Sequence, residues 1–90
     1  MKVGAVVMLI FNVAIADGLT NGSVGKVIAI IQETDDNGNS HVKSVIVSFD
    51  DPSIGLLQQE KYPVYSANYK HVNGVPIFRE TLEYLSLIHI

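Results

Sequence analysis

Three runs of apolar residues set the main pattern of the chain. They cover residues 3–11, 24–31 and 42–49. Valine, isoleucine and threonine supply 25 of the 90 residues, and β-branched side chains favour strands. We therefore predict a β-strand in each run. The first two runs are almost continuously apolar, which fits a strand that is buried on both faces.

The third run alternates between an apolar face and a mixed face. The apolar face carries Val45, Val47 and Phe49. The mixed face carries Ser44, Ile46 and Ser48. A period of two with one apolar face predicts a half-buried strand, with the mixed face toward water.

Turn-forming residues separate the three runs. Between the first two lie Asp17-Gly18 and Asn21-Gly22, where glycine or asparagine supplies a positive φ. The polar segment 35–39, between the second and third runs, predicts a hairpin loop.

The pattern changes after residue 50. Residues 54–57 favour a short helical turn, but Gly55 and Pro63 oppose a long helix. A last strand is expected over residues 75–82. Four to five short strands joined by hairpin turns predict an all-β fold, a small barrel.

Composition limits the classes of protein that fit. The mass is 9.8 kDa, which allows one domain. Hydrophobic residues make up 48% and charged residues 17%, against a usual charged share of about 25%. This excludes a disordered tail and suggests a piece of a larger protein. The net charge of −3 predicts no broad basic face.

Several kinds of site and segment are excluded. The absence of cysteine removes disulfides, thiolate nucleophiles and cysteine-rich zinc sites. No nucleophile elbow, phosphate-binding loop or dinucleotide fingerprint is present. We therefore expect no catalytic or cofactor-binding residue in this chain, which should be inactive as an enzyme by itself. The first apolar run is too short to cross a membrane.

The acidic loop offers the best match to a metal site. Asp35, Asn37 and Asn39 occupy the first three ligand positions of a calcium-binding loop. Ser40 then replaces the required glycine, and Ile46 replaces the closing glutamate. A solvated hairpin tip is the better interpretation. The histidines at 41, 71 and 89 are too scattered for a zinc site, so no metal ligand is predicted.

Nucleic-acid binding remains open from the residues alone. The basic residues are dispersed, although a barrel can gather such residues on one rim: Lys2, Lys26, Lys43, Lys61, Lys70 and Arg79. The tyrosines at 62, 65 and 69 either stack on bases or cover the edge of the core with their hydroxyl groups in water.

A secretory signal is a competing interpretation of the N-terminus. Lys2 precedes an apolar stretch, and Ala14-Ile15-Ala16 resembles a cleavage site. The single positive charge and the polar Asn12 after the apolar run argue against it.

The order of several short motifs resembles Pif-type ATP-dependent DNA helicases, which belong to superfamily one together with the RecD type. The resemblance covers about residues 2–80. Its first part consists of Lys2-Val3-Gly4-Ala5, Val7-Met8-Leu9, Asn12, Gly18-Leu19, Asn21-Gly22, Gly25 and Val27. Its second part consists of Val45, Val47, Phe49-Asp50 and Val75-Pro76-Ile77.

The resemblance implies that residues 2–84 are the 2B region of such a helicase, an SH3-like barrel near the DNA path. This barrel would help to hold single-stranded DNA during unwinding in repair, recombination or telomere maintenance. ATP and Mg²⁺ would bind the missing motor domains, which would be partners of the barrel. The location would be intracellular, in the nucleus or mitochondrion of a eukaryote. A protein-interaction barrel and a small secreted β-protein are the alternatives.

Individual residues receive expected roles within this interpretation. The residues expected to contact nucleic acid are Asn12, Lys26, Tyr65 and Lys70. The residues expected to shape turns are Gly18, Asn21, Gly22 and Gly25, with Gly25 relieving crowding where the next strand begins. Asn12 has a second possible role, a hydrogen bond to the turn backbone. The first barrel strand would include residues 3–12, which leaves no room for a cleaved signal.

The chain also departs from the helicase pattern. Arg79 stands where a proline is common, and the nucleotide-binding motifs and the arginine finger are missing. Residues 85–90 match the translation of a sequencing-library adapter, and we interpret them as an artefact on a truncated gene fragment. This interpretation gives the apolar end no role in the core and gives His89 no function.

Overall fold

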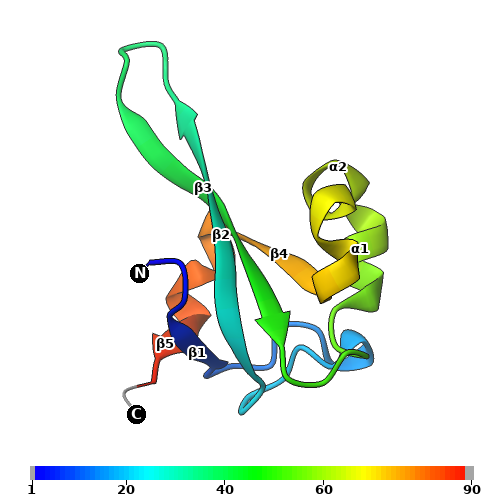
Figure 1. The fold of residues 1–90 in the computed structure, drawn as a ribbon. Coiled ribbons are helices and arrows are strands. Elements are labelled where there is room, and N and C mark those ends of the chain that lie inside the picture. The colour runs from blue at the N-terminus through cyan, green and yellow to red at the C-terminus, as the bar shows by residue number, and fades with distance from the viewer. Residues whose placement is uncertain (1, 89–90) are drawn as a thin grey trace.

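Five short strands form one antiparallel sheet in the computed structural model, which describes residues 2–88 (Figure 1). The strands are β1 (Val6–Leu9), β2 (Val24–Thr34), β3 (Ser40–Phe49), β4 (Gly74–Phe78) and β5 (Leu85–Leu87). Their order across the sheet is β4-β3-β2-β1-β5. The predicted all-β fold, a small barrel of short strands, is confirmed.

Short helices fill the connections between strands. Two are α-helices, α1 (Leu56–Lys61) and α2 (Pro63–Ser66). The others are 3₁₀ helices, namely η1 (Ile15–Asp17), η2 (Ala67–Val72) and η3 (Arg79–Tyr84). Helices α1, α2 and η2 follow one another almost without interruption, and we call residues 56–72 the helical segment.

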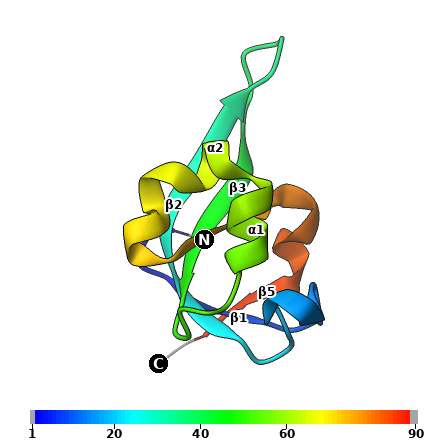
Figure 2. The same ribbon diagram turned by 90° about the vertical axis from the view of Figure 1, so that its right-hand side faces the viewer.

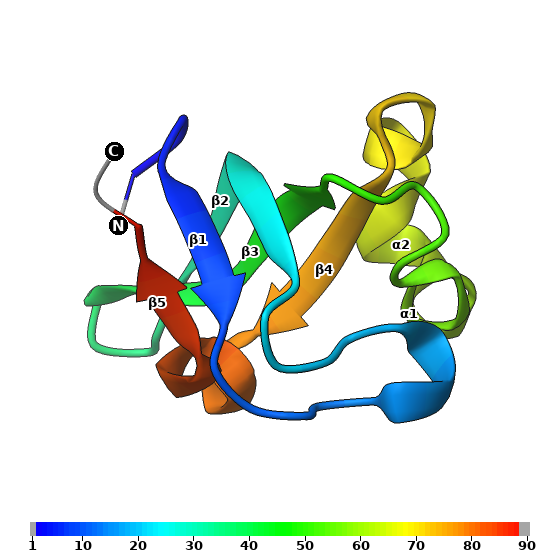
Figure 3. The ribbon, with the colours of Figure 1, turned by 90° about the horizontal axis from the view of Figure 1, so that it is seen from below.

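The core lies on the concave side of the sheet. Viewed from below, the strands curve around it (Figure 3). Every strand contributes, and Leu19 closes one end from the loop before β2. Two irregularities in the β2–β3 pairing add to the curvature, since extra residues increase local twist. The buried core residues are Val7, Leu9, Leu19, Val27, Val45, Val47, Phe49, Val75, Ile77 and Leu85.

The hairpin between β2 and β3 projects beyond the rest of the sheet (Figure 1). At its tip the Asp35 carboxylate accepts hydrogen bonds from the backbone N–H groups of Asn37 and Asn39, both at 2.9 Å. Gly38 takes the left-handed conformation with φ 83°. The predicted hairpin loop is confirmed, and the Asp35 side chain is used to hold it.

The turn residues before β2 adopt their predicted roles. Gly18 and Gly22 have φ of 74° and 98°. The backbone N–H of Asn21 donates to the Asn12 side-chain oxygen at 2.9 Å. A Cβ on Gly25 would lie 2.7 Å from the Ser48 carbonyl oxygen, so only glycine fits against β3.

The prediction of a half-buried third strand is wrong. Ser44 and Ile46, on the mixed face of β3, are fully buried. The helical segment covers this face, and the Ser48 hydroxyl donates to the Val72 carbonyl of η2 at 2.7 Å. In contrast, β1 buries only Val7 and Leu9 on one face. A strand's alternation could not reveal a cover supplied by residues 56–72.

The helical segment is longer than predicted, and the last long strand is shorter. Gly55, with φ 84°, starts α1 instead of ending it, and Pro63 occupies the first turn of α2, where it is tolerated. Strand β4 ends at Phe78, and η3 replaces the expected strand over residues 79–82. This helix carries the chain from one edge of the sheet to β5 at the other edge.

Helix α1 also protects the free edge of β4. The side-chain amide of Gln58 donates to the Pro76 carbonyl at 3.1 Å, and that of Gln59 donates to the Gly74 carbonyl at 2.9 Å. These bonds use edge groups that would otherwise invite pairing with another strand.

The expectation that the apolar end has no role in the core is wrong for its first residues. Strand β5 pairs with β1, with Leu85 opposite Leu9. Leu85 is only 8% exposed and belongs to the core. His89 and Ile90 lie outside the described residues. The adapter interpretation concerns the origin of these residues and stays a prediction.

Replacing Leu85 with alanine is expected to lower the free energy of unfolding by about 2–3 kcal/mol, because it removes buried side-chain volume. Leu87 is the matched control, since it is 45% exposed in the same strand; its replacement should change stability by less than about 1 kcal/mol. Urea unfolding of both variants measures the difference. Equal effects would contradict a role for Leu85 in the core.

Candidate nucleic-acid interface

An aromatic cluster joins the helical segment to the end of β4. Figure 2 looks onto this segment, which lies in front of β2 and β3. The rings of Tyr62 and Tyr65 pack against Phe78, with ring centroids 4.5 and 5.1 Å away. The Tyr65 ring meets Phe78 edge-on, a favoured aromatic geometry. These half-buried rings anchor the helical segment and leave part of their surface in solvent.

Two lysines flank the aromatic cluster. The Lys43 ammonium lies 5.4 Å from the centre of the Tyr65 ring, and the Lys61 ammonium lies 5.6 Å from that of Tyr62. Both distances are within the range of cation–π attraction. Each exposed tyrosine edge therefore has a positive charge beside it.

A carboxylate moderates the charge at Lys43. The Glu33 carboxylate accepts from His41 at 3.0 Å and pairs with Lys43 at 3.2 Å. Hydrogen bonds from His41 and Lys43 lower the pKa of the Glu33 carboxyl group. Contacts with Tyr65 and Glu33 raise the pKa of Lys43. All these groups are exposed, so the pairs add little stability, but Lys43 stays charged.

Two more lysines lie on the same side of the sheet. Lys26 pairs with Ser48 in the β2–β3 register, so both side chains share a face. The Ser48 hydroxyl bonds to η2, which also contains Lys70. We call the face covered by residues 56–72 the helical face. It carries four of the six basic residues, namely Lys26, Lys43, Lys61 and Lys70.

The predicted contact residues are only partly brought together. Lys26, Tyr65 and Lys70 all belong to the helical face. Asn12 does not, because it lies in the loop after β1, where its side-chain oxygen accepts from Asn21. Its geometry supports the structural role that the sequence also allowed.

The tyrosines also serve the fold. Tyr62, Tyr65 and Tyr69 are half-buried, and a Cβ on Gly74 would lie 2.5 Å from the Tyr69 Cβ. Tyr69 therefore packs closely over the start of β4. The two sequence interpretations, covering the core edge and offering a stacking surface, describe different parts of the same rings.

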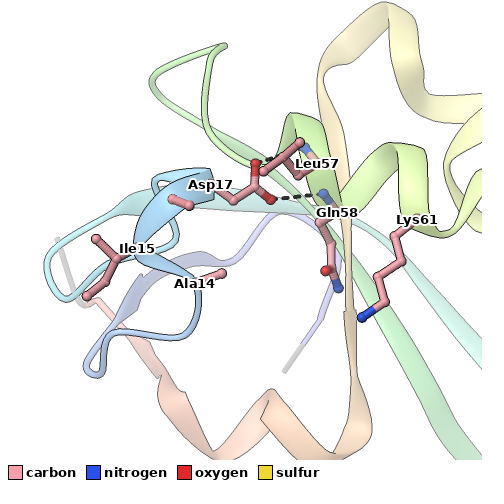
Figure 4. Close-up of a pocket in the computed structure, with 7 residues that line it drawn as sticks. Ala14, Ile15, Asp17, Leu57, Gln58 and Lys61 are labelled. Carbon is pink, nitrogen blue, oxygen red and sulfur yellow. Dashed lines mark hydrogen bonds between the residues drawn. The ribbon is translucent and has the colours of Figure 1, made fainter.

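A buried carboxylate holds α1 in place. Asp17 lies in η1, and its two carboxylate oxygens accept from the backbone N–H groups of Leu57 and Gln58 at 2.8 and 2.9 Å. Its own carbonyl accepts from Gly55 at 2.9 Å. Asp17 thus supplies the helix cap that Gly55 lacks. Figure 4 shows both side-chain bonds.

Sequence reasoning assigned no site role to Asp17 or Phe78, and it did not single out Lys43 or Lys61 among the dispersed lysines. Asp17 was recognised only as a turn residue, because its partners lie 40 and 41 residues away. The adjacent Lys61-Tyr62 was a local signal that could have been used. Nothing local connects Lys43 to Tyr65.

Other kinds of site receive no support within residues 2–88. This part of the chain contains no group of three or more acidic, histidine or cysteine side chains placed to hold a metal ion. None of its helices combines the length and the apolar character needed to cross a membrane. Comparison of the chain with protein-family models, curated proteins and solved structures gave no significant match.

Proposed function

We propose that this chain is the accessory β-barrel of an ATP-dependent DNA helicase, and that its helical face contacts single-stranded DNA. The observation that carries the proposal is the gathering of four lysines around half-exposed tyrosines on a protein whose net charge is −3. The remaining basic residues, Lys2 and Arg79, lie outside the helical segment.

This arrangement suits a single strand better than a duplex. Lysine ammonium groups attract the phosphates of any sequence, while exposed ring surface at Tyr62 and Tyr65 offers stacking to unpaired bases. Neither contact reads a sequence, as a helicase accessory domain requires. Unwinding itself, with ATP and Mg²⁺, would be carried out by motor domains outside this chain.

Binding of a fluorescent thymidine oligonucleotide, followed by anisotropy between about 50 and 200 mM salt, tests the proposal. We expect affinity to fall as salt rises. Lys26→Gln and Lys70→Gln should each reduce the slope of log affinity against log salt by about 0.7. Tyr65→Leu should weaken binding by about 1–3 kcal/mol, whereas Tyr65→Phe keeps the ring.

Lys2→Gln is the matched charge control, since Lys2 lies before β1 and outside the helical segment. It should leave the salt slope almost unchanged. Salt-independent binding, or an equal effect of Lys2→Gln and Lys70→Gln, would contradict DNA contact through the helical face.

A further inference from the structure

A cavity of about 300 Å³ lies between η1 and α1, beside the helical face (Figure 4). Its volume is at the lower end of the range for ligand pockets, which is room for one large side chain rather than for a nucleotide. The residues that line it are Ala14, Ile15, Ala16, Asp17, Leu57, Gln58 and Lys61.

The walls of this cavity are unusually apolar for an exposed site. Ile15 is 71% exposed and Leu57 is 55% exposed, and they line the cavity from opposite elements. Single exposed hydrophobic residues need no explanation, but two that meet at one hollow mark a binding surface. The small side chains of Ala14 and Ala16 leave the space between them.

The polar groups of the cavity have a definite sign. The Asp17 carboxylate is only 7% exposed, and both oxygens are engaged by the Leu57 and Gln58 amides. The Gln58 side-chain N–H₂ donates to the Pro76 carbonyl, which leaves its oxygen available. The Lys61 ammonium is thus the charge that the cavity presents to an incoming group.

We propose that this cavity binds a short acidic and apolar peptide segment of a partner protein. A large aliphatic side chain of the peptide would enter between Ile15 and Leu57. A neighbouring carboxylate would pair with Lys61, and a peptide N–H would donate to the Gln58 side-chain oxygen. The single cation beside apolar walls favours this occupant, because a nucleic acid would need several cations and a stacking surface.

A blocked leucine–aspartate–leucine peptide is the probe, and the amide NMR shifts of Leu57 and Gln58 report binding. We expect saturable shifts. Ala16→Phe should weaken binding at least tenfold, because the ring fills the space for the peptide side chain. Lys61→Gln should weaken it about threefold, as for an exposed ion pair, and a peptide with asparagine in place of aspartate should show the same loss.

Matched variants control for charge and size. Lys70→Gln removes an equal charge, and Ala67→Phe adds an equal ring at another exposed alanine; both should bind the peptide as the unaltered protein does. Absence of saturable shifts, or equal effects of Ala16→Phe and Ala67→Phe, would overturn the proposal. Because the probe is a peptide and DNA binding is tested at Lys26, Lys70 and Tyr65, either proposal can fail without the other.

Discussion

Replacing Gly55 with alanine is expected to lower the free energy of unfolding by about 3–5 kcal/mol, the sum of backbone strain and overpacking. Gly55 is buried and has φ 84°. An added Cβ would lie 2.4 Å from the Val75 Cγ2. The change would push α1 away from β4 and so disturb the helical segment as a whole.

Gly38→Ala separates the two contributions. Gly38 has nearly the same backbone conformation, φ 83°, but no atom lies within 4 Å of an added Cβ. Only the strain of a left-handed alanine remains there, about 1–2 kcal/mol. Urea unfolding of both variants measures the difference. Equal losses would show that Gly55 is not in close contact with Val75.

Replacing Asp17 with alanine is expected to lower the free energy of unfolding by about 3 kcal/mol. The change removes two charge-assisted hydrogen bonds and leaves the amides of Leu57 and Gln58 without a partner in a poorly hydrated position. Hydrogen exchange of these two amides should accelerate, because the first turn of α1 loses its cap.

Asp35→Ala is the matched control for Asp17→Ala. The Asp35 carboxylate also accepts two backbone N–H groups, at 2.9 Å each, but it is exposed at the hairpin tip. Water can replace it, so the loss should be about 1 kcal/mol. Similar losses for the two variants, or unchanged exchange at Leu57 and Gln58, would contradict the role of Asp17 as the cap of α1.

Much of the fold could be predicted because it depends on local signals. The alternation of Val45, Val47 and Phe49 gave the inward face of β3, and the polar segment 35–39 gave the hairpin tip. Gly18 and Gly22 were identified from turn chemistry, and each has a positive φ. Such features depend on residues that are neighbours in the sequence.

The missed features all depend on contacts between distant residues. The cover over Ser44 and Ile46 comes from a helical segment whose short helices have weak sequence signals. The carboxylate of Asp17 reaches amides 40 residues away. Lys43 meets Tyr65 only after β3 and α2 have packed together. The interface was therefore predicted as a class of residues, while its location came from the tertiary structure.

The DNA on both sides of this reading frame gives the most direct test of the helicase proposal. We predict an upstream sequence that encodes a G-K-[ST] phosphate-binding loop, and a frame that continues past Tyr84 into further helicase motifs. Because position 85 faces the core, the native residue there should be apolar even if residues 85–90 come from an adapter. A genuine start signal at Met1 together with an authentic stop after Ile90 would contradict the proposal and indicate a free-standing barrel.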